Sequence, residues 1–104
     1  MEAFHRSDAF LRAARAAARK GGYDPKKLTL AEDGRHKLTY DSPEGVKHFG
    51  LRGYGDYLWY SRTDPELAVK KRHVFRTSHG ALSRKRGLGR YSPNELAMHI
   101  LWPM

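Results

Sequence analysis

Cysteine is absent from this chain of 104 residues. Disulfide bonds and thiolate metal sites are therefore excluded, and nothing indicates a secreted, oxidising compartment. Long apolar runs are absent as well, since none approaches the roughly 20 residues that a membrane-spanning helix needs. The N-terminal residues, Met1 to Arg6, lack the apolar core of a signal peptide. We expect a soluble protein that is made in the cytosol.

Acidic residues are missing from the whole stretch between Glu66 and Glu95, although the chain has eleven carboxylates. The same stretch contains a run of basic side chains: Lys70, Lys71, Arg72, Arg76, Arg84, Lys85, Arg86 and Arg90. A surface of one sign attracts polyanions and acidic proteins over roughly a Debye length, about 8–10 Å at physiological salt. The formal charge of +9 is likewise typical of nucleic-acid binders, ribosomal-type proteins and inner components of nucleoprotein particles.

The totals predict one small basic domain over residues 1–104, because a chain of this length has no room for a second core. Only 39% of the residues are hydrophobic, which is below the average of globular proteins. Two Trp, six Tyr and four Phe nevertheless argue against disorder. We expect a thin core of large rings, completed by contact with another molecule.

A first helix is predicted from Ser7, which can cap it, to about Lys20, where two glycines end it. At 100° per residue, three basic side chains fall within one arc of about 60°: Arg12, Arg15 and Arg19. The opposite side is apolar and flat: Phe10, Ala14 and Ala17. The arginine stripe indicates either a contact with a polyanion or an ordinary solvated helix face.

Three short extended segments follow: 28–31, 36–41 and 46–50. Glu32-Asp33-Gly34 and Ser42-Pro43-Glu44-Gly45 between them are typical of hairpin turns. In the middle segment Leu38 and Tyr40 share one face, with Lys37 and Thr39 on the other. This alternation predicts a meander with one covered side, and so small a sheet needs a helix packed on it.

Two more helices are predicted in the C-terminal half. One begins at Pro65 and could run to His79, with Gly80 closing it, and Ala81 to Arg90 is then expected to be a flexible basic loop. The other runs from Pro93 to Trp102 behind a capping box at Ser92. The fold class is therefore α+β: a small three-stranded antiparallel meander packed with an N-terminal helix, a central basic helix and a short C-terminal helix.

No arrangement typical of catalysis or metal binding stands out. The histidines lack the three-to-five-residue spacing of a zinc site, and no nucleophile elbow or Walker pattern occurs. Asp56 and Asp64 are too isolated for a metal-dependent nuclease. Three glycines around Arg52 leave a phosphate-cradling loop open: Gly50, Gly53 and Gly55. We expect no enzymatic activity, no metal and no cofactor.

The aromatic side chains allow two interpretations. Four rings near Arg52 and Arg62 can stack unpaired bases at roughly 1–3 kcal/mol each: Tyr54, Tyr57, Trp59 and Tyr60. Alternatively these rings form the core, which we favour because a protein this small has few other large side chains. The apolar stripe of the last helix packs either on its own sheet or on a neighbouring subunit: Leu96, Ile100 and Trp102.

Short motifs follow one another between Lys37 and Pro103: His48-Phe49-Gly50, Gly53-Tyr54, Asp56-Tyr57, Asp64-Pro65-Glu66, His79-Gly80 and Leu101-Trp102-Pro103. In order and spacing they resemble a family of small basic uncharacterised proteins encoded by large double-stranded DNA viruses of algae and amoebae, with distant tailed-phage relatives. Ser78 stands where that family usually has arginine, and residues 58–62 also depart from its pattern. The resemblance implies a viral origin and a non-enzymatic, virion-associated role.

Charge and resemblance together predict a non-enzymatic structural protein of the virion, a minor capsid or internal component made in the host cytoplasm. Its basic face would contact acidic capsid subunits or the packaged genome. The alternative is a freestanding DNA- or RNA-binding protein without sequence preference. The candidate contact residues are Arg12, Arg15, Arg19, Arg52, Lys70, Arg72, Arg76, Arg84, Lys85, Arg86 and Arg90. Arg84-Lys85-Arg86 also resembles a nuclear-localisation signal.

Overall fold

The sheet of the computed structural model, which describes residues 1–104, has three antiparallel strands in the order β1-β2-β3. They are β1 (Leu28–Leu30), β2 (His36–Ser42) and β3 (Gly45–Leu51). In the turn between β2 and β3, the Ser42 hydroxyl donates a hydrogen bond to the Gly45 carbonyl at 2.6 Å and accepts one from the Glu44 amide at 3.1 Å. The predicted meander is confirmed, and β1 and β3 are its edges.

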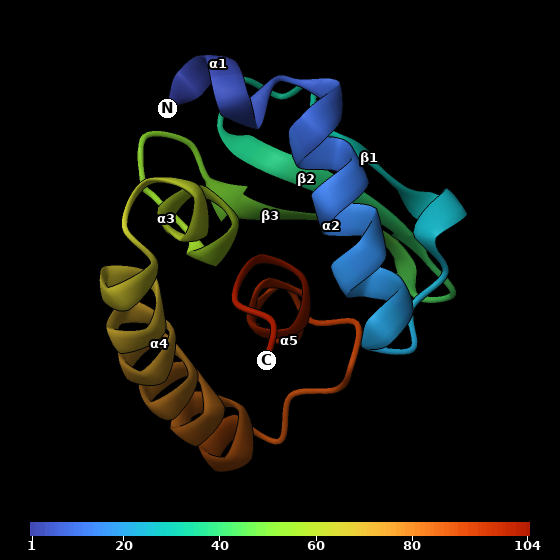
Figure 1. Cartoon of the computed structure of the whole chain (residues 1–104). Helices are drawn as coiled ribbons and strands as arrows, with labels where there is room; N and C mark the ends of the chain where they lie inside the picture. Colours follow the sequence, from blue (N-terminus) through green and yellow to red (C-terminus); the bar gives the residue numbers. More distant parts are fainter.

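Helical segments surround this sheet and make the chain a mixed α+β domain, as predicted. They are α1 (Glu2–His5), α2 (Asp8–Lys20), η1 (Pro25–Lys27), α3 (Tyr57–Thr63), α4 (Pro65–Arg86), α5 (Pro93–Leu96) and η2 (Ala97–Leu101). The α5–η2 segment lies in the middle of the molecule, with α2 and the sheet on one side and α4 on the other (Figure 1). None of these helices combines the length and the apolar character needed to cross a bilayer.

The core forms where the central α5–η2 segment meets α2 and the sheet. The largest buried side chains in this core are Phe10, Leu28, Leu38, Phe49, Leu96, Ile100 and Leu101. Trp102 follows η2 and is 8% exposed. Its ring stacks on that of Phe75 in α4, with 4.8 Å between the ring centroids. The C-terminal apolar stripe therefore packs within its own domain.

Local capping signals set the helix starts. The Ser7 hydroxyl accepts a hydrogen bond from the Phe10 amide at 3.2 Å, and the Ser92 hydroxyl accepts one from the Glu95 amide at 3.2 Å. Asp64 caps α4 through the Leu67 amide at 3.2 Å. These contacts satisfy amides that have no partner inside the first turn. The predicted starts of the three main helices are confirmed.

The predicted end of α4 is wrong. The helix continues through Gly80 to Arg86 and ends at Gly87, which adopts the left-handed conformation with φ of 62°. A tertiary contact holds the added turns, because the buried Ser83 hydroxyl donates to Glu95 Oε2 at 2.7 Å and accepts from Asn94 Nδ2 at 2.8 Å. The expected loop Ala81–Arg90 is therefore helical over its first six residues, since packing against α5 outweighs the local preference of glycine.

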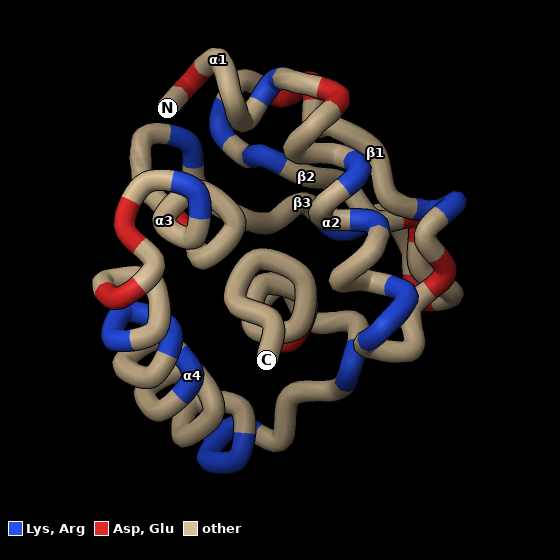
Figure 2. The backbone as a smooth tube through the Cα atoms, viewed as in Figure 1, with Lys and Arg blue, Asp and Glu red and all other residues tan.

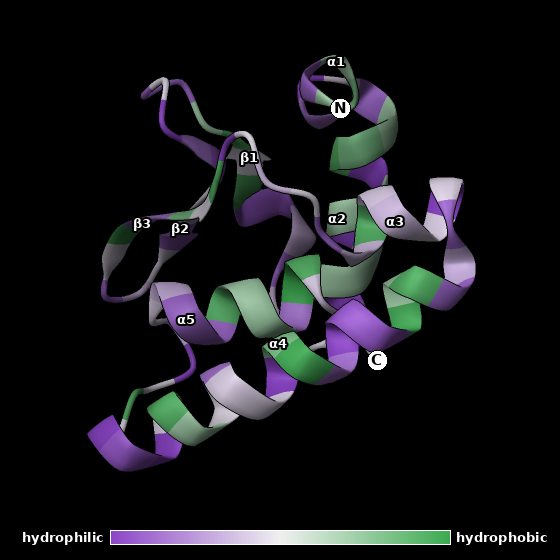
Figure 3. Cartoon of the chain, turned by 90° about the vertical axis from the view of Figure 1, so that its left-hand side faces the viewer, coloured by the Kyte–Doolittle hydropathy of each residue, from purple (hydrophilic) through white to green (hydrophobic).

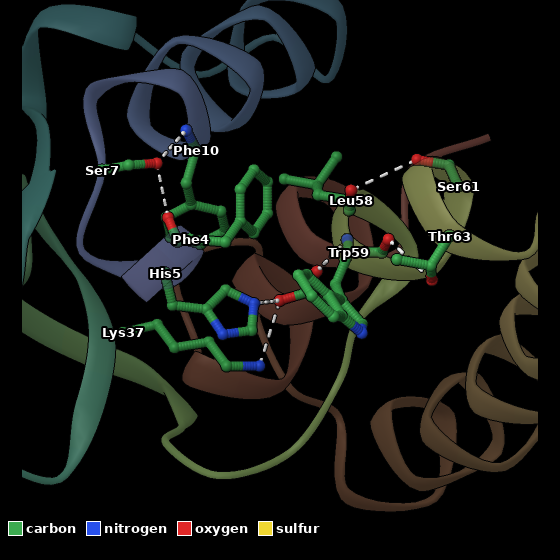
Figure 4. Close-up of polar contacts among 10 residues, drawn as sticks. Phe4, His5, Ser7, Phe10, Lys37, Leu58, Trp59, Ser61 and Thr63 are labelled. Carbon is green, nitrogen blue, oxygen red and sulfur yellow. Dashed lines mark hydrogen bonds and ion pairs between the residues drawn. The ribbon is translucent and has the colours of Figure 1, made fainter. Parts of the chain in front are cut away.

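A buried charged cluster corrects the prediction that Lys37 faces away from the covered side of the sheet. Lys37 is only 3% exposed, and its Nζ lies 3.0 Å from Asp56 Oδ2. His5 Nε2 reaches the same oxygen at 2.8 Å (Figure 4), an ion-pair contact without hydrogen-bond alignment. Asp56 also caps α3, since Oδ1 accepts the Trp59 amide at 2.9 Å. The cluster thus joins α1, β2 and the start of α3.

Candidate polyanion interface

The solvent side of α4 is the most one-sided charged surface of the molecule. Its exposed cations are Lys70, Lys71, Arg84, Lys85 and Arg86. None of the ion pairs in the structure includes a Lys or Arg of α4. Figure 2 shows basic positions along the helix and acidic ones only at its start, and Figure 3 shows hydrophilic stretches of the helix interspersed with hydrophobic ones. This set of five residues, called the α4 basic face below, is free to meet an external anion.

The length of α4 makes this surface extended. A helix of 22 residues is about 33 Å long at 1.5 Å per residue, and its cations occur near both ends. Cations in the last turn also interact favourably with the helix dipole. The exposed cations thus lie in the second turn, at Lys70 and Lys71, and in the last turn, at residues 84–86, whereas the first turn carries Glu66.

Two hollows adjoin the inner border of α4, with volumes of about 440 and 590 Å³. Arg76 and Arg84 line both of them, and His73 and Thr77 line the smaller one. The smaller hollow contains no Asp or Glu side chain, whereas Glu95 lines the larger one. Two guanidinium groups next to a recess on one helix suit the oxygens of a phosphate or a carboxylate.

Arg72 and Arg76 are placed differently from the prediction that they simply face a partner. Arg72 Nη1 donates to the Pro103 carbonyl at 3.0 Å. Arg76 Nη1 donates to the carbonyls of Met98 and Trp102 at 2.7 and 2.9 Å. The last carbonyls of a helix have no partner within it, and cations stabilise that end of its dipole. Both arginines therefore hold the C-terminal segment against α4, and Arg76 only borders the hollows.

Three other predicted contact residues also bind carbonyls of this chain. Arg15 donates from Nε and Nη2 to the Leu28 carbonyl at 3.1 and 2.9 Å, and Arg52 Nε donates to the His36 carbonyl at 3.3 Å. Arg90 Nη2 donates to the Gly22 carbonyl at 2.8 Å. The Arg52 side chain is thus turned toward the sheet.

Arg12 and Arg19 are exposed and have no recorded partner, but they belong to α2. Since α2 and α4 lie on different sides of the α5–η2 segment (Figures 1 and 3), these two arginines do not extend the α4 basic face. The eleven predicted contact residues therefore fall into three groups. Two groups are exposed, one on α2 and one on α4, and the residues of the third group bind carbonyls of the chain itself: Arg15, Arg52, Arg72, Arg76 and Arg90.

The aromatic residues predicted to lie in a contact surface or in the core also differ in their exposure. Tyr54 is 68% exposed, so the core interpretation is wrong for it. Tyr57 and Trp59 are half-buried on α3. The Arg72 guanidinium lies 4.4 Å from the Tyr57 ring centroid, and the Trp59 ring lies 5.8 Å from that of Phe4. Tyr57 and Trp59 therefore join α3 to α4 and α1.

Asp56 has a structural role that was not predicted from the sequence. Burial raises the pKa of its carboxyl, but the contacts with His5 and Lys37 lower it by more, so the pKa lies below the ordinary value of an aspartate. The carboxyl group is inaccessible to solvent, which suits a structural role. Its position directly before the aromatic α3 segment is typical of a helix N-cap, and this was the signal available in the sequence.

The lowered pKa of Asp56 predicts that the fold loses stability in acid. A carboxyl group whose pKa is depressed by folding stabilises the native state fully above its unfolded value of about 3.9, and this contribution is lost as the pH falls through the folded value. The urea midpoint should therefore drop below about pH 4. The Asp56→Asn variant should show a smaller drop, and an identical pH profile for both proteins would contradict the assignment. Asp33, whose pKa is also lowered, by the His36 backbone amide above all, requires Asp33→Asn as a control.

Comparisons with protein-family models, curated proteins and solved structures find no match for this chain. Within the structure, no three His, Asp or Glu side chains come together as ligands of a metal ion.

Proposed function

We propose that this protein is a non-enzymatic structural component of a virus particle, a minor capsid or internal protein, which uses the α4 basic face to contact acidic capsid subunits or the packaged genome. One observation carries the adhesive part of this proposal: the acid-free stretch is a long helix whose exposed cations have no carboxylate partner in the chain. Because a rigid helix carries these cations, little backbone entropy is lost when a polyanion binds, although each long side chain still loses rotamer freedom. The viral part rests on the sequence resemblance alone.

A charge-matched pair of triple variants tests the basic face. Arg84→Ala, Lys85→Ala and Arg86→Ala together lower the net charge from +9 to +6, and so do Lys26→Ala, Lys27→Ala and Arg35→Ala, which are exposed positions outside α4. In a gel-shift titration on duplex DNA, the first set should reduce the slope of log K against log salt by about 2 to 3, following −0.9 per phosphate contact. The second set should leave that slope nearly unchanged. Equal losses for both sets would mean that only the net charge matters.

A second candidate, a freestanding nucleic-acid-binding protein without sequence preference, is favoured by the same unpaired cations. The two candidates differ in where the protein resides. A capsid or internal component should co-purify with intact particles and resist protease until the particles are opened. A freestanding binder should be absent from purified particles and should bind unrelated duplexes with equal affinity and steep salt dependence.

A further inference from the structure

Charge is unevenly distributed along the α4 basic face. Its five cations form two clusters, one at Lys70 and Lys71 in the second turn and one at residues 84–86 in the last turn. Lys71 and Arg84 are 13 positions apart, which is about 20 Å along the helix at 1.5 Å per residue. The exposed residues between the two clusters carry no formal charge: His73, Val74, Thr77, Ser78 and Ala81.

The uncharged middle of α4 faces the same way as the clusters. At 100° per residue, Lys70, Lys85 and three residues between them fall within one arc of about 80°: Val74, Ser78 and Ala81. The Ser78 hydroxyl donates to the Val74 and Phe75 carbonyls at 3.1 and 3.2 Å, so it is engaged within the helix. Because α4 lies along the outer border of the molecule (Figure 1), this face is open to a large partner.

This distribution of charge is complementary to the major groove of duplex DNA. Two rows of phosphates border the groove, and the base edges between them carry no formal charge. The major groove is about 12 Å wide and admits an α-helix, whereas the minor groove, at about 6 Å, is narrower than a helix of about 10–12 Å diameter. The distance of about 20 Å between the clusters exceeds the width of the major groove, so each cluster reaches one of its rims.

The division into two clusters favours DNA over an acidic protein surface. Phosphate charge recurs regularly along both strands of a duplex, whereas the carboxylates of a protein surface have no fixed spacing. The N-terminal end of α4 limits the extent of the contact, because Asp64 and Glu66 are exposed there and phosphates repel them. The part of the helix that suits the duplex therefore begins at Lys70.

We propose that α4 lies in the major groove of duplex DNA, with Lys70 and Lys71 on the phosphates of one strand and residues 84–86 on those of the other. The proposal rests on the function proposed above, since it names the partner of the same basic face. Phosphate contacts fix the position and orientation of a protein on the duplex but carry no sequence information. With Ser78 bonded inside the helix and apolar side chains at Val74 and Ala81, α4 binds without a preferred sequence.

The test uses the full chain and a short DNA duplex in which every cytosine is replaced by glucosylated 5-hydroxymethylcytosine. The sugar projects from C5 of the base into the major groove, while the phosphate charge stays the same. Fluorescence anisotropy at low salt should show binding at least about tenfold weaker than to the unmodified duplex of the same sequence. Double-stranded RNA, whose major groove is deep and narrow, should also bind more weakly. Equal affinity for the glucosylated and the unmodified DNA overturns the proposal.

Two matched substitutions test which face of α4 enters the groove. Val74→Glu and Val69→Glu each lower the net charge from +9 to +8, at valines that are 67% and 50% exposed. Val74 lies between the clusters, whereas Val69 lines the smaller hollow at the inner border of α4. Val74→Glu should weaken binding to the unmodified duplex at least about fivefold more than Val69→Glu, because it brings like charges together. Circular dichroism checks that both variants are folded, and equal weakening by the two also overturns the proposal.

A failure of groove binding is distinguishable from a failure of the function proposed above. If glucosylation has no effect but the triple alanine variant at residues 84–86 still lowers the salt slope, α4 contacts phosphates from outside the groove and only the groove proposal fails. If polyglutamate binds through α4 and duplex DNA does not, the partner is an acidic protein, and again only the groove proposal fails. If neither polyanion binds, both proposals fail.

Discussion

Replacing Asp56 by alanine should lower the free energy of unfolding by about 3–5 kcal/mol, which is the usual result of removing one member of a buried ion pair. Lys37 and His5 would remain buried beside the vacated site, with no other acidic partner. The Trp59 amide would also lose its cap. A domain of this size has a total stability of roughly 5–15 kcal/mol, so the melting temperature should fall by about 15–30 °C.

Two further variants separate charge from capping at this position. Asparagine caps a helix as well as aspartate does, so Asp56→Asn should keep the bond to α3 and lose only the charge. Adding Lys37→Met to Asp56→Asn removes the unpaired ammonium and should recover part of the lost stability, giving a coupling energy in a double-mutant cycle. The cycle also requires Lys37→Met alone, and urea unfolding followed by circular dichroism measures its four proteins: the parent, Asp56→Asn, Lys37→Met and the double variant. Additive effects of the two changes would show that the ion pair is not what stabilises this junction.

The second large effect is expected at Trp102. Trp102→Ala removes a ring that is 8% exposed and stacks on Phe75, and deletion of a large buried aromatic side chain costs about 3–5 kcal/mol. The loss should also loosen the C-terminal segment, because the Trp102 carbonyl is one of the two that Arg76 binds. The midpoint of guanidinium unfolding should shift accordingly.

Conservative replacement of the same residue serves as the control. Trp102→Phe retains an aromatic ring over Phe75 and should lose only about 1–2 kcal/mol. Trp59→Ala removes a tryptophan that is only half-buried and should also be milder than Trp102→Ala. If Trp102→Ala is as stable as the parent protein, the stacking between η2 and α4 does not hold these segments together.

The fold leaves fewer Lys and Arg side chains without a partner inside the chain than the sequence suggests. Arg15, Arg52, Arg72, Arg76 and Arg90 bind carbonyl groups of the chain itself. Of the eleven predicted contact residues, those left for an external partner are Lys70, Arg84, Lys85 and Arg86 of α4 and Arg12 and Arg19 of α2. Affinity for a polyanion should therefore depend on a few lysines and arginines of α4 rather than on the net charge.

Short-range signals in the sequence were enough to predict the meander and the three main helices, but not α1, η1 or α3. Ser7, Ser92 and the proline at position 65 mark helix starts, and the alternation of Leu38 and Tyr40 marks a covered strand. These features depend on neighbours within a turn or a hairpin, so the chain itself carries them. The end of α4 did not follow from local signals, because a glycine such as Gly80 typically ends a helix. The contacts of Ser83 with the α5 segment, which hold the helix beyond Gly80, are tertiary.

By itself the sequence determined the α+β composition, the three-stranded meander and the presence of a long acid-free basic segment. Only the tertiary structure decided which arginines bind carbonyl groups of the chain itself, and that Asp56 is the buried partner of Lys37 and His5. The physical reason is that a guanidinium or an ammonium binds any carbonyl or carboxylate oxygen within reach. Its partner, often twenty or more residues away, is therefore chosen by how the helices pack on the sheet.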